Sequence, residues 1–388
     1  MTMTDTTVTA HTPRLETTLP GEHRTFLREE TIGLDEIKPQ FSRPRPLRAR
    51  TFDDKASFFG SLAGGLGMAW VAYSFVFPFS GMMSFFICWY LAFVVLYLGT
   101  TALAAPSQVV IDRLVGAVIQ AIAGMTGIAL ATAVAYPFIR GYHALLHTNF
   151  LLHDQRGVGP QDAFTHGGVE HAIVGTLIEI GIAVLFALPL GVGTAVFMSE
   201  VGGRFAIIVR TVVEAMTALP SVVAGLFIYT FMIVDLHFPK TGFTASMAIF
   251  VMILPIIARA SDVVLRVVPS GLREASLALG ASRWQTVWRV VLPTVRPGLA
   301  TALILGIARG VGETSPVLLT SGASTFFNAN LSPHADPMNS LPLSILFPVR
   351  SGENLAIERG FGAASVLLAL VLLLFVITRL VARRKVSR

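Results

Sequence analysis

Charged residues and cysteine are both scarce in this chain. Only 13% of its 388 residues are charged, whereas hydrophobic residues make up 53% and the mean hydropathy is +0.69. Soluble domains usually carry about 25% charged residues. The single cysteine, Cys88, lies inside an apolar stretch, so an intrachain disulfide is excluded. This composition excludes an ordinary soluble domain and predicts an integral membrane protein.

A nucleotide-binding loop is also missing. None of the four lysines has the glycine before it and the Ser or Thr after it that a Walker A motif requires; they are Lys38, Lys55, Lys240 and Lys385. The histidines lie outside the apolar stretches or, as His171 does, at the start of one, and Cys88 has no evident base beside it. The sequence therefore predicts no catalytic residue, no metal site and no cofactor in this chain.

Long apolar runs are abundant by contrast. A helix needs about 20 apolar residues to cross a bilayer, and eight stretches are long enough: 58–79, 82–105, 114–139, 170–198, 207–233, 244–266, 297–320 and 360–382. We expect an all-α integral membrane fold with about eight transmembrane helices. The polar residues 1–57, rich in Thr, Pro and Arg, predict a disordered tail.

The basic residues predict the orientation. If both termini are cytoplasmic, 23 of the 29 Lys and Arg lie on the cytoplasmic side and five on the other, with Arg309 inside a helix. This is the asymmetry of a multi-pass protein of a bacterial plasma membrane. The net charge of +6 does not predict nucleic-acid binding, because the basic residues flank apolar stretches and so favour contact with membrane lipid.

The cytoplasmic loop 269–297 has the most specific pattern. It begins PSGLREASLALG, in which Leu272, Ala275 and Leu279 recur at helical spacing. Gly280 fits a helix C-cap with positive φ. A helix this short is marginal in water, and two interpretations of it remain open: an interfacial helix on lipid, or a docking element for a soluble partner.

A second short helix is predicted to follow. Ser282 and Gln285 form a capping-box pattern that opens it, and Pro293 is predicted to end or kink it. The loop therefore reads as helix, glycine turn, helix.

This loop resembles the EAA loop of ABC importer permeases. The matching positions, with the family's spacing, are Glu274, Ala275, Ser276, Gly280, Val290, Leu292 and Pro293. Ser276 replaces an alanine of the family pattern, and Val290 replaces an isoleucine. The resemblance implies that the first short helix is a coupling helix that docks on an ATPase subunit.

Two further segments resemble the phosphate-specific permease, PstA type. They are the run ARGVGETSP from Ala308 to Pro316 and the run PSVVAGLF from Pro220 to Phe227. The resemblance covers about 110–385 and implies a six-helix type I ABC importer core. Residues 58–105 lie outside it, as two extra helices whose role the sequence does not assign.

The resemblance also implies partners and a role. These partners are a second phosphate permease (PstC type), two ATPase subunits (PstB type) that hold ATP and Mg, and an extracytoplasmic phosphate-binding protein (PstS type). The chain itself would be a permease and not an enzyme. The alternatives are an ABC permease for another oxyanion, such as sulfate or molybdate, and a secondary transporter, in which an EAA loop would have no purpose.

A charged pair in the seventh predicted helix is the candidate substrate site. Arg309 offers a fork of donors suited to phosphate oxygens, and Glu313 lies four residues on, on the same face. Thr314 and Ser315 follow directly. The alternative is an ion pair that only holds helices together, and intramembrane charges more often serve function.

Other polar residues in the predicted helices give weaker signals. Pro220 and Ser221 are expected to break the fifth helix and open a carbonyl toward the path, or merely to kink it. Glu179 and Glu214 favour interhelical hydrogen bonding. Histidines in the exterior segment 140–169 favour a solvated loop over a metal site, because no Cys and few carboxylates join them.

Overall fold

The fold is all-helical over the residues that the computed structural model describes, 52–76, 81–104 and 106–384. They form two compact units, divided after Ile119, and a single long helix, α3 (Ser107–Arg140), runs through the division. Seven helices are long and apolar enough to cross a membrane, or eight if one bent pair counts as a span. The prediction of an all-α membrane protein is confirmed.

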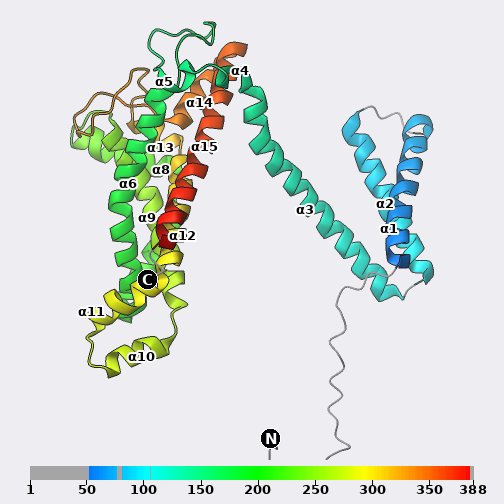
Figure 1. Cartoon of the computed structure of the whole chain (residues 1–388), viewed down its shortest axis with the longest axis horizontal. Helices are drawn as coiled ribbons and strands as arrows, with labels where there is room; N and C mark the ends of the chain where they lie inside the picture. Colours follow the sequence, from blue (N-terminus) through cyan, green and yellow to red (C-terminus); the bar gives the residue numbers. More distant parts are fainter. Residues whose placement is uncertain (1–51, 77–80, 105, 385–388) are drawn as a thin grey trace, which may run out of the picture. The chain divides into compact units, whose positions relative to one another are not determined.

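The first unit is an antiparallel helical hairpin followed by the start of α3 (Figure 1). It contains α1 (Phe52–Val71), the π-helix η1 (Ala72–Val76) and α2 (Met82–Ala104). The helices pack closely because Gly65 leaves no side chain between α1 and the Phe93 backbone. Aromatic rings line the contact, with Phe58 edge-on to both Phe93 and Tyr97. Outward residues are large and apolar, as lipid-facing residues are.

The second unit is a helical bundle. After α3 its elements are α4 (Tyr142–Leu145), α5 (Asn149–Leu152), α6 (Glu170–Val196), η2 (Phe197–Val201), α7 (Gly203–Thr217), α8 (Ser221–Ile228), η3 (Tyr229–Asp235), α9 (Gly242–Arg266), α10 (Ser270–Ala278), α11 (Arg283–Thr286), η4 (Val287–Val291), α12 (Leu292–Val311), α13 (Ser315–Thr320), α14 (Leu341–Arg350) and α15 (Asn354–Arg384). Helices α10 and α11 lie at one end of this bundle, and α4, α5 and α14 at the other (Figure 1).

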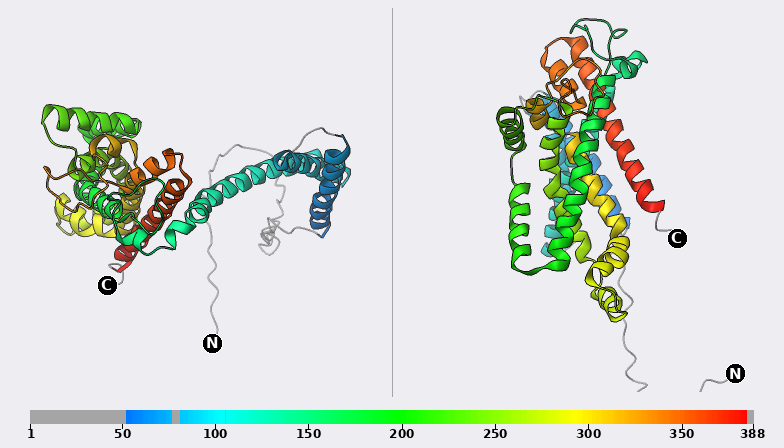
Figure 2. Two further views of the ribbon diagram at one scale, coloured as in Figure 1. Left: turned by 90° about the horizontal axis from the view of Figure 1, so that it is seen from above. Right: turned by 90° about the vertical axis from the view of Figure 1, so that its left-hand side faces the viewer.

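The bundle packs around α9, the most buried of its spans. One face of α9 carries Ile249, Ile253 and Ile257, all buried against α6 and α12. Gly310 makes the close approach of α12 possible, because a Cβ there would lie 3.0 Å from both Ile180 and Ile249. Figure 2 shows the long helices of the bundle side by side. This tight packing makes α6, α9 and α12 a shared framework for the sites at both ends.

Several predicted boundaries were wrong. Helix α1 begins at Phe52, so 52–57 belong to a helix and not to the predicted tail; residues 1–51 lie outside the described part. The fifth predicted helix, 207–233, is two helices, Gly203–Thr217 and Ser221–Asp235, at 103° to each other.

The seventh predicted helix and the segment that follows it also differ from the prediction. The seventh, 297–320, breaks between α12 and α13, and its span starts early, at Arg283, because the helix runs straight through Pro293. Pro293 therefore does not end the helix; it follows the π-helical turn η4 directly, and local π geometry of this kind accommodates a proline within a membrane helix. Helix α14 was not predicted because its apolar run is too short to span.

Candidate functional site

The loop 269–297 folds as its sequence predicts. Helix α10 ends at Ala278, and Gly280 turns the chain with φ of +83°. Ser282 then accepts a hydrogen bond from the Gln285 N–H at 3.2 Å, while the Gln285 side chain accepts one from the Ser282 N–H at 3.0 Å. This reciprocal cap opens α11. The helix–glycine–helix prediction is confirmed.

Helix α10 leaves most of its surface free. Glu274 and Ala275 are exposed, and Leu279 is 89% exposed. Ser276 is half-buried, because its hydroxyl hydrogen-bonds the Thr286 hydroxyl at 2.9 Å. The apolar positions predicted from spacing therefore face outward, where a partner can cover them.

Leu292 and Pro293 connect the loop to the bundle. They follow the π-helix η4 in one continuous run. Leu292 packs on a buried cluster formed by Ala195, Leu265, Val268, Val291 and Val295. The Leu292–Pro293 end of the loop pattern thus lies in the packing of α12 against α6 and α9, and away from the exposed helix α10.

The charged pair lies where α12 breaks. Helix α12 ends at Val311, and Arg309 Nε lies 2.8 Å from Glu313 Oε1. The Arg309 side chain is 54% exposed and that of Glu313 only 7%. A cation in the last turn of a helix is favoured by the helix dipole. The guanidinium is therefore held by its carboxylate partner yet remains open on one side.

The two segments that resemble PstA-type permeases, 220–227 and 308–316, pack against each other. Thr314 and Ser315 are half-buried at the start of α13, and Pro220 and Ser221 lie at the start of α8, directly after the bend. Helices α8 and α13 pack so closely that a Cβ at Gly225 would lie 2.5 Å from Pro316 Cα. The structure thus places two broken helices, α7–α8 and α12–α13, side by side.

The predicted break at Pro220 is present, but its carbonyl is occupied. The Val223 and Ala224 N–H groups donate to the Pro220 carbonyl at 3.0 and 3.3 Å. The bend therefore reorients α8 and does not present this carbonyl to a substrate.

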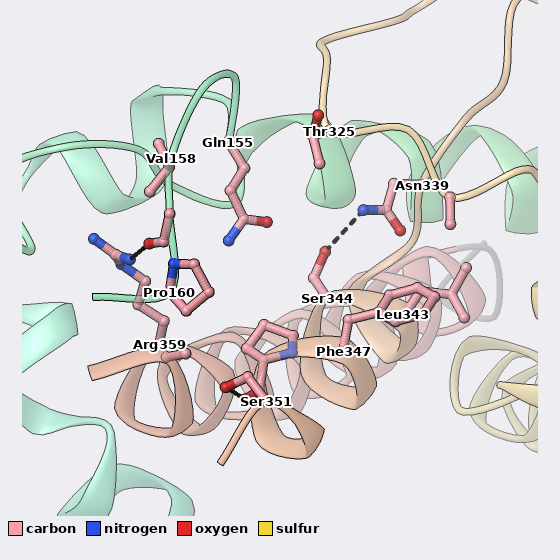
Figure 3. Close-up of a pocket in the computed structure, with 14 residues that line it drawn as sticks. Gln155, Val158, Pro160, Thr325, Asn339, Leu343, Ser344, Phe347, Ser351 and Arg359 are labelled. Carbon is pink, nitrogen blue, oxygen red and sulfur yellow. Dashed lines mark hydrogen bonds between the residues drawn. The ribbon is translucent and has the colours of Figure 1, made fainter. Parts of the chain in front are cut away.

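The opposite end of the bundle carries a cavity of about 360 Å³ (Figure 3). Gln155, Val158 and Pro160 line one side of it and helix α14 the other. A strap, residues 153–168, is held there by Arg359, whose guanidinium donates to the carbonyls of Gly159, Asp162, Ala163 and His166 at 2.7–3.3 Å. Arg359 is only 6% exposed, and no sequence pattern indicated that it would be buried.

The other polar residues that the sequence singled out lie in different surroundings. Glu179 is buried, and one of its carboxyl oxygens has no hydrogen-bond partner, whereas Glu214 is exposed. His143 lies 3.1 Å from Glu358. Within the described ranges, no three His, Cys, Asp or Glu residues are grouped so that they could hold a metal ion.

Sequence reasoning missed the ion pairs at the end of the bundle near α10. Arg273 Nη2 lies 2.9 Å from Glu200, and Asp262 lies 3.0 Å from Arg266 and 3.5 Å from Arg210. Only the Asp262–Arg266 pair has a sequence signal, its i, i+4 spacing. The others join residues far apart in the chain.

Comparison with known proteins identifies the family. The family model described as "Binding-protein-dependent transport system inner membrane component" matches residues 187–387. A "Phosphate transport system permease protein PstA 1" of Mycobacterium tuberculosis is 40% identical over 233 residues, which is 60% of this chain and 75% of that protein. The chain belongs to the PstA family of type I ABC permeases. The resemblance read from the sequence is thereby confirmed.

Further PstA relatives come from distant bacteria. The "Phosphate transport system permease protein PstA" of Mycobacterium leprae is 38% identical over 60% of this chain and 75% of its own length. That of Haemophilus influenzae is 32% identical over 56% of this chain and 77% of its own length. The residues matched by the family model, 187–387, include the loop 269–297 and the Arg309–Glu313 pair.

Proposed function

We infer that this PstA-family protein is a transmembrane permease of an ATP-driven importer of inorganic phosphate. The observation that carries this conclusion is the 40% identity to a phosphate transport system permease over three quarters of that protein. The half-exposed Arg309 guanidinium supports it, because its planar fork of donors matches phosphate oxygens. A sulfate or molybdate permease is not favoured.

The partners follow from the surfaces that the chain leaves open. The exposed helix α10 supports docking of an ATPase subunit of PstB type, two copies of which would hold ATP and Mg. The open side of Arg309 supports a path shared with a second permease of PstC type. A phosphate-binding protein of PstS type would deliver the substrate outside. This chain would itself hydrolyse no ATP.

The predicted orientation agrees with these partner assignments. With both termini in the cytoplasm, α10 and α11 lie on the cytoplasmic side, and the strap and α14 lie outside. Nucleotide-driven closure of the ATPases would move α10. The bundle would then change access to Arg309 from the outer to the inner side.

In this proposal, Glu313 and phosphate exchange as partners of the Arg309 guanidinium. Without substrate, Glu313 neutralises the guanidinium, which lowers the cost of a charge within the membrane. A phosphate oxygen would replace or share that contact. Glu313 would also accept a hydrogen bond from protonated phosphate, which sulfate does not offer at neutral pH.

Reconstituted transport tests this function. We would place the four-component complex, which is this chain with its PstC-, PstB- and PstS-type partners, in liposomes. We would then measure ATP-dependent uptake of radiolabelled phosphate. We expect excess unlabelled phosphate to suppress the signal and equal sulfate or molybdate to leave it nearly unchanged. Uptake of labelled sulfate or molybdate in preference to phosphate would contradict the assignment.

A further inference from the structure

Helix α10 turns two of its residues toward the rest of the protein. Only Arg273 and Ser276 are half-buried; the other residues from Ser270 to Ala278 are exposed. Ser276 reaches α11, its own neighbour, through the Thr286 hydroxyl. Arg273 reaches further, to two membrane-spanning helices. It is therefore the residue through which α10 contacts the spans α6 and α9.

The Arg273 guanidinium makes four hydrogen bonds. Its Nε and Nη2 donate to Glu200 Oε1 at 3.2 and 2.9 Å. Its Nη1 donates to the Val268 carbonyl at 2.8 Å, and its Nη2 also donates to the Leu265 carbonyl at 3.0 Å. Glu200 belongs to η2, at the end of the span Glu170–Val201. One side chain thus fastens α10 to the ends of two spans.

The two carbonyls lie at or just past the C-terminal end of α9, and that of Leu265 also accepts a hydrogen bond from the Val268 N–H at 3.4 Å. Leu265 lies in the last turn of α9, and Val268 lies just past its end at Arg266. The last carbonyls of a helix must be satisfied from outside, and a cationic donor there is favoured by the helix dipole. Arg273 therefore serves as the C-terminal cap of α9 as well as the partner of Glu200.

The ion pair is sheltered enough to be strong. The side chains of Arg273 and Glu200 are 25% and 14% exposed, whereas fully exposed pairs contribute little. The fork geometry of arginine fixes direction as well as distance. A lysine could supply the charge but not four donors in one plane.

We propose that Arg273 is the positioning residue that transmits movement of α10 to α6 and α9, with Glu200 as its receiving carboxylate. This proposal rests on the proposed function, in which an ATPase moves α10. The chain already joins α10 to α9 through residues 267–269. The Glu200 contact adds α6, so both helices of the closely packed α6–α9 pair follow α10 together.

The variant Glu200→Gln separates transmission from docking. It removes the ionic contact to α6, while the Arg273 bonds to Leu265 and Val268 remain. In the reconstituted four-component complex, we would measure ATPase co-purification, ATP hydrolysis, and phosphate moved per ATP. We expect co-purification and basal hydrolysis to stay within about two-fold, and phosphate per ATP to fall by about five-fold or more.

Three further variants calibrate the result. Arg273→Lys should give a phosphate-to-ATP ratio between those of the parent complex and Glu200→Gln. Arg273→Gln should give a ratio as low as that of Glu200→Gln. The charge swap Arg273→Glu with Glu200→Arg should recover part of the ratio lost in Glu200→Gln, because the ion pair returns without the carbonyl bonds. Arg266→Gln is the matched control: it removes the half-exposed pair with Asp262 at the same end of α9 and should leave the ratio unchanged.

A readout without phosphate keeps this test distinct from that of the proposed function. In a Cys88→Ala background, a cysteine at Leu219, which is exposed beside the α7–α8 bend, would be labelled with a maleimide. We expect an ATP analogue to change the labelling rate in the parent complex and not in Glu200→Gln.

The outcomes divide cleanly. A normal phosphate-to-ATP ratio or a normal nucleotide response in Glu200→Gln would overturn the proposal. Loss of ATPase co-purification in that variant would also overturn it, since the pair would then only shape the docking surface. The parent complex could instead transport no phosphate and still show a nucleotide response that Glu200→Gln loses. That result would refute the substrate assignment and leave transmission supported.

Discussion

Arg309 and Glu313 share an ion pair but differ in their surroundings. The Arg309 side chain is half-exposed, while Glu313 is almost enclosed. Replacing Arg309 therefore leaves a buried carboxylate without its partner, at a cost of about 3 kcal/mol if the group stays charged. Replacing Glu313 leaves a cation that faces outward and costs less.

We predict that Arg309→Gln abolishes phosphate uptake while the complex still assembles. Glutamine keeps much of the volume and can hydrogen-bond Glu313, but it offers no cation to a phosphate. The measurements are uptake in vesicles and the yield of purified complex. Basal hydrolysis by the ATPase partner should persist, because that chemistry lies at the opposite, cytoplasmic side.

The double variant Arg309→Gln, Glu313→Gln decides between the two roles of this pair. A purely structural pair should be rescued, because removing both charges can be nearly neutral. A phosphate ligand should not be rescued. Recovered uptake in the double variant would therefore show that Arg309 serves packing alone.

At this scale, sequence predicts contacts only between near neighbours. The pairing of Arg309 with Glu313 follows from their four-residue spacing, and the reciprocal cap of Ser282 and Gln285 follows from their three-residue spacing. Arg273 with Glu200 and Arg359 with the strap carbonyls join segments that are distant in the chain. No local pattern encodes such contacts, because they depend on how the helices pack.

Among the elements, α10 depends on one glycine for its shape. Gly280 has φ of +83°, and a Cβ there would meet open space. A side chain would therefore be opposed by backbone strain and not by a clash, at about 1–2 kcal/mol for alanine and more for a β-branched residue.

We predict that Gly280→Val abolishes ATPase binding or transport while the protein still inserts in the membrane. Gly280→Asn should be milder, since asparagine tolerates this conformation. Gly271→Ala is the matched control, because Gly271 also has free space but lacks a positive φ. Normal phosphate uptake by Gly280→Val would rule out the docking role of α10.

The position of the strap, residues 153–168, depends on the side chain of Arg359. Each hydrogen bond from a cation contributes about 1.5–3 kcal/mol, and Arg359 makes four with the strap. We predict that Arg359→Gln speeds cleavage of 153–168 by a protease added from outside by about ten-fold or more. Arg350→Gln, exposed on α14, should not change it. Equal cleavage rates in both variants would show that Arg359 does not hold the strap.

Sequence predicts the elements unevenly for physical reasons. Long apolar runs and the glycine turn after α10 are local signals, so those elements were correctly placed. The bend between α7 and α8 and the break between α12 and α13 each fall within one predominantly apolar stretch, so hydropathy joins the two halves; Pro220 predicts the first of these breaks. Helix α14 is apolar but short, and only its burial at the outer end of the bundle explains it.

For the whole molecule, the division of the chain gives a test of the extra hairpin. The family model matches only residues 187–387, and the hairpin α1–α2 lies in a separate compact unit. We predict that deleting residues 1–105 leaves part of the phosphate-dependent transport, provided the rest inserts correctly. Insertion is checked by complex yield. Complete loss of transport from a well-assembled deletion complex would show that the hairpin takes part in transport.

The long helix α3 has a consequence for the membrane itself. Its 34 residues extend roughly 50 Å, whereas the hydrocarbon layer is about 30 Å thick. The excess must be taken up by tilt or by emergence into the headgroup layer. Because only 6% of its apolar window is buried within this chain, packing against the chain's own helices does little to set this tilt. Acyl-chain length therefore acts on α3 directly, and bilayers of graded thickness should change its angle before they change any helix of the bundle.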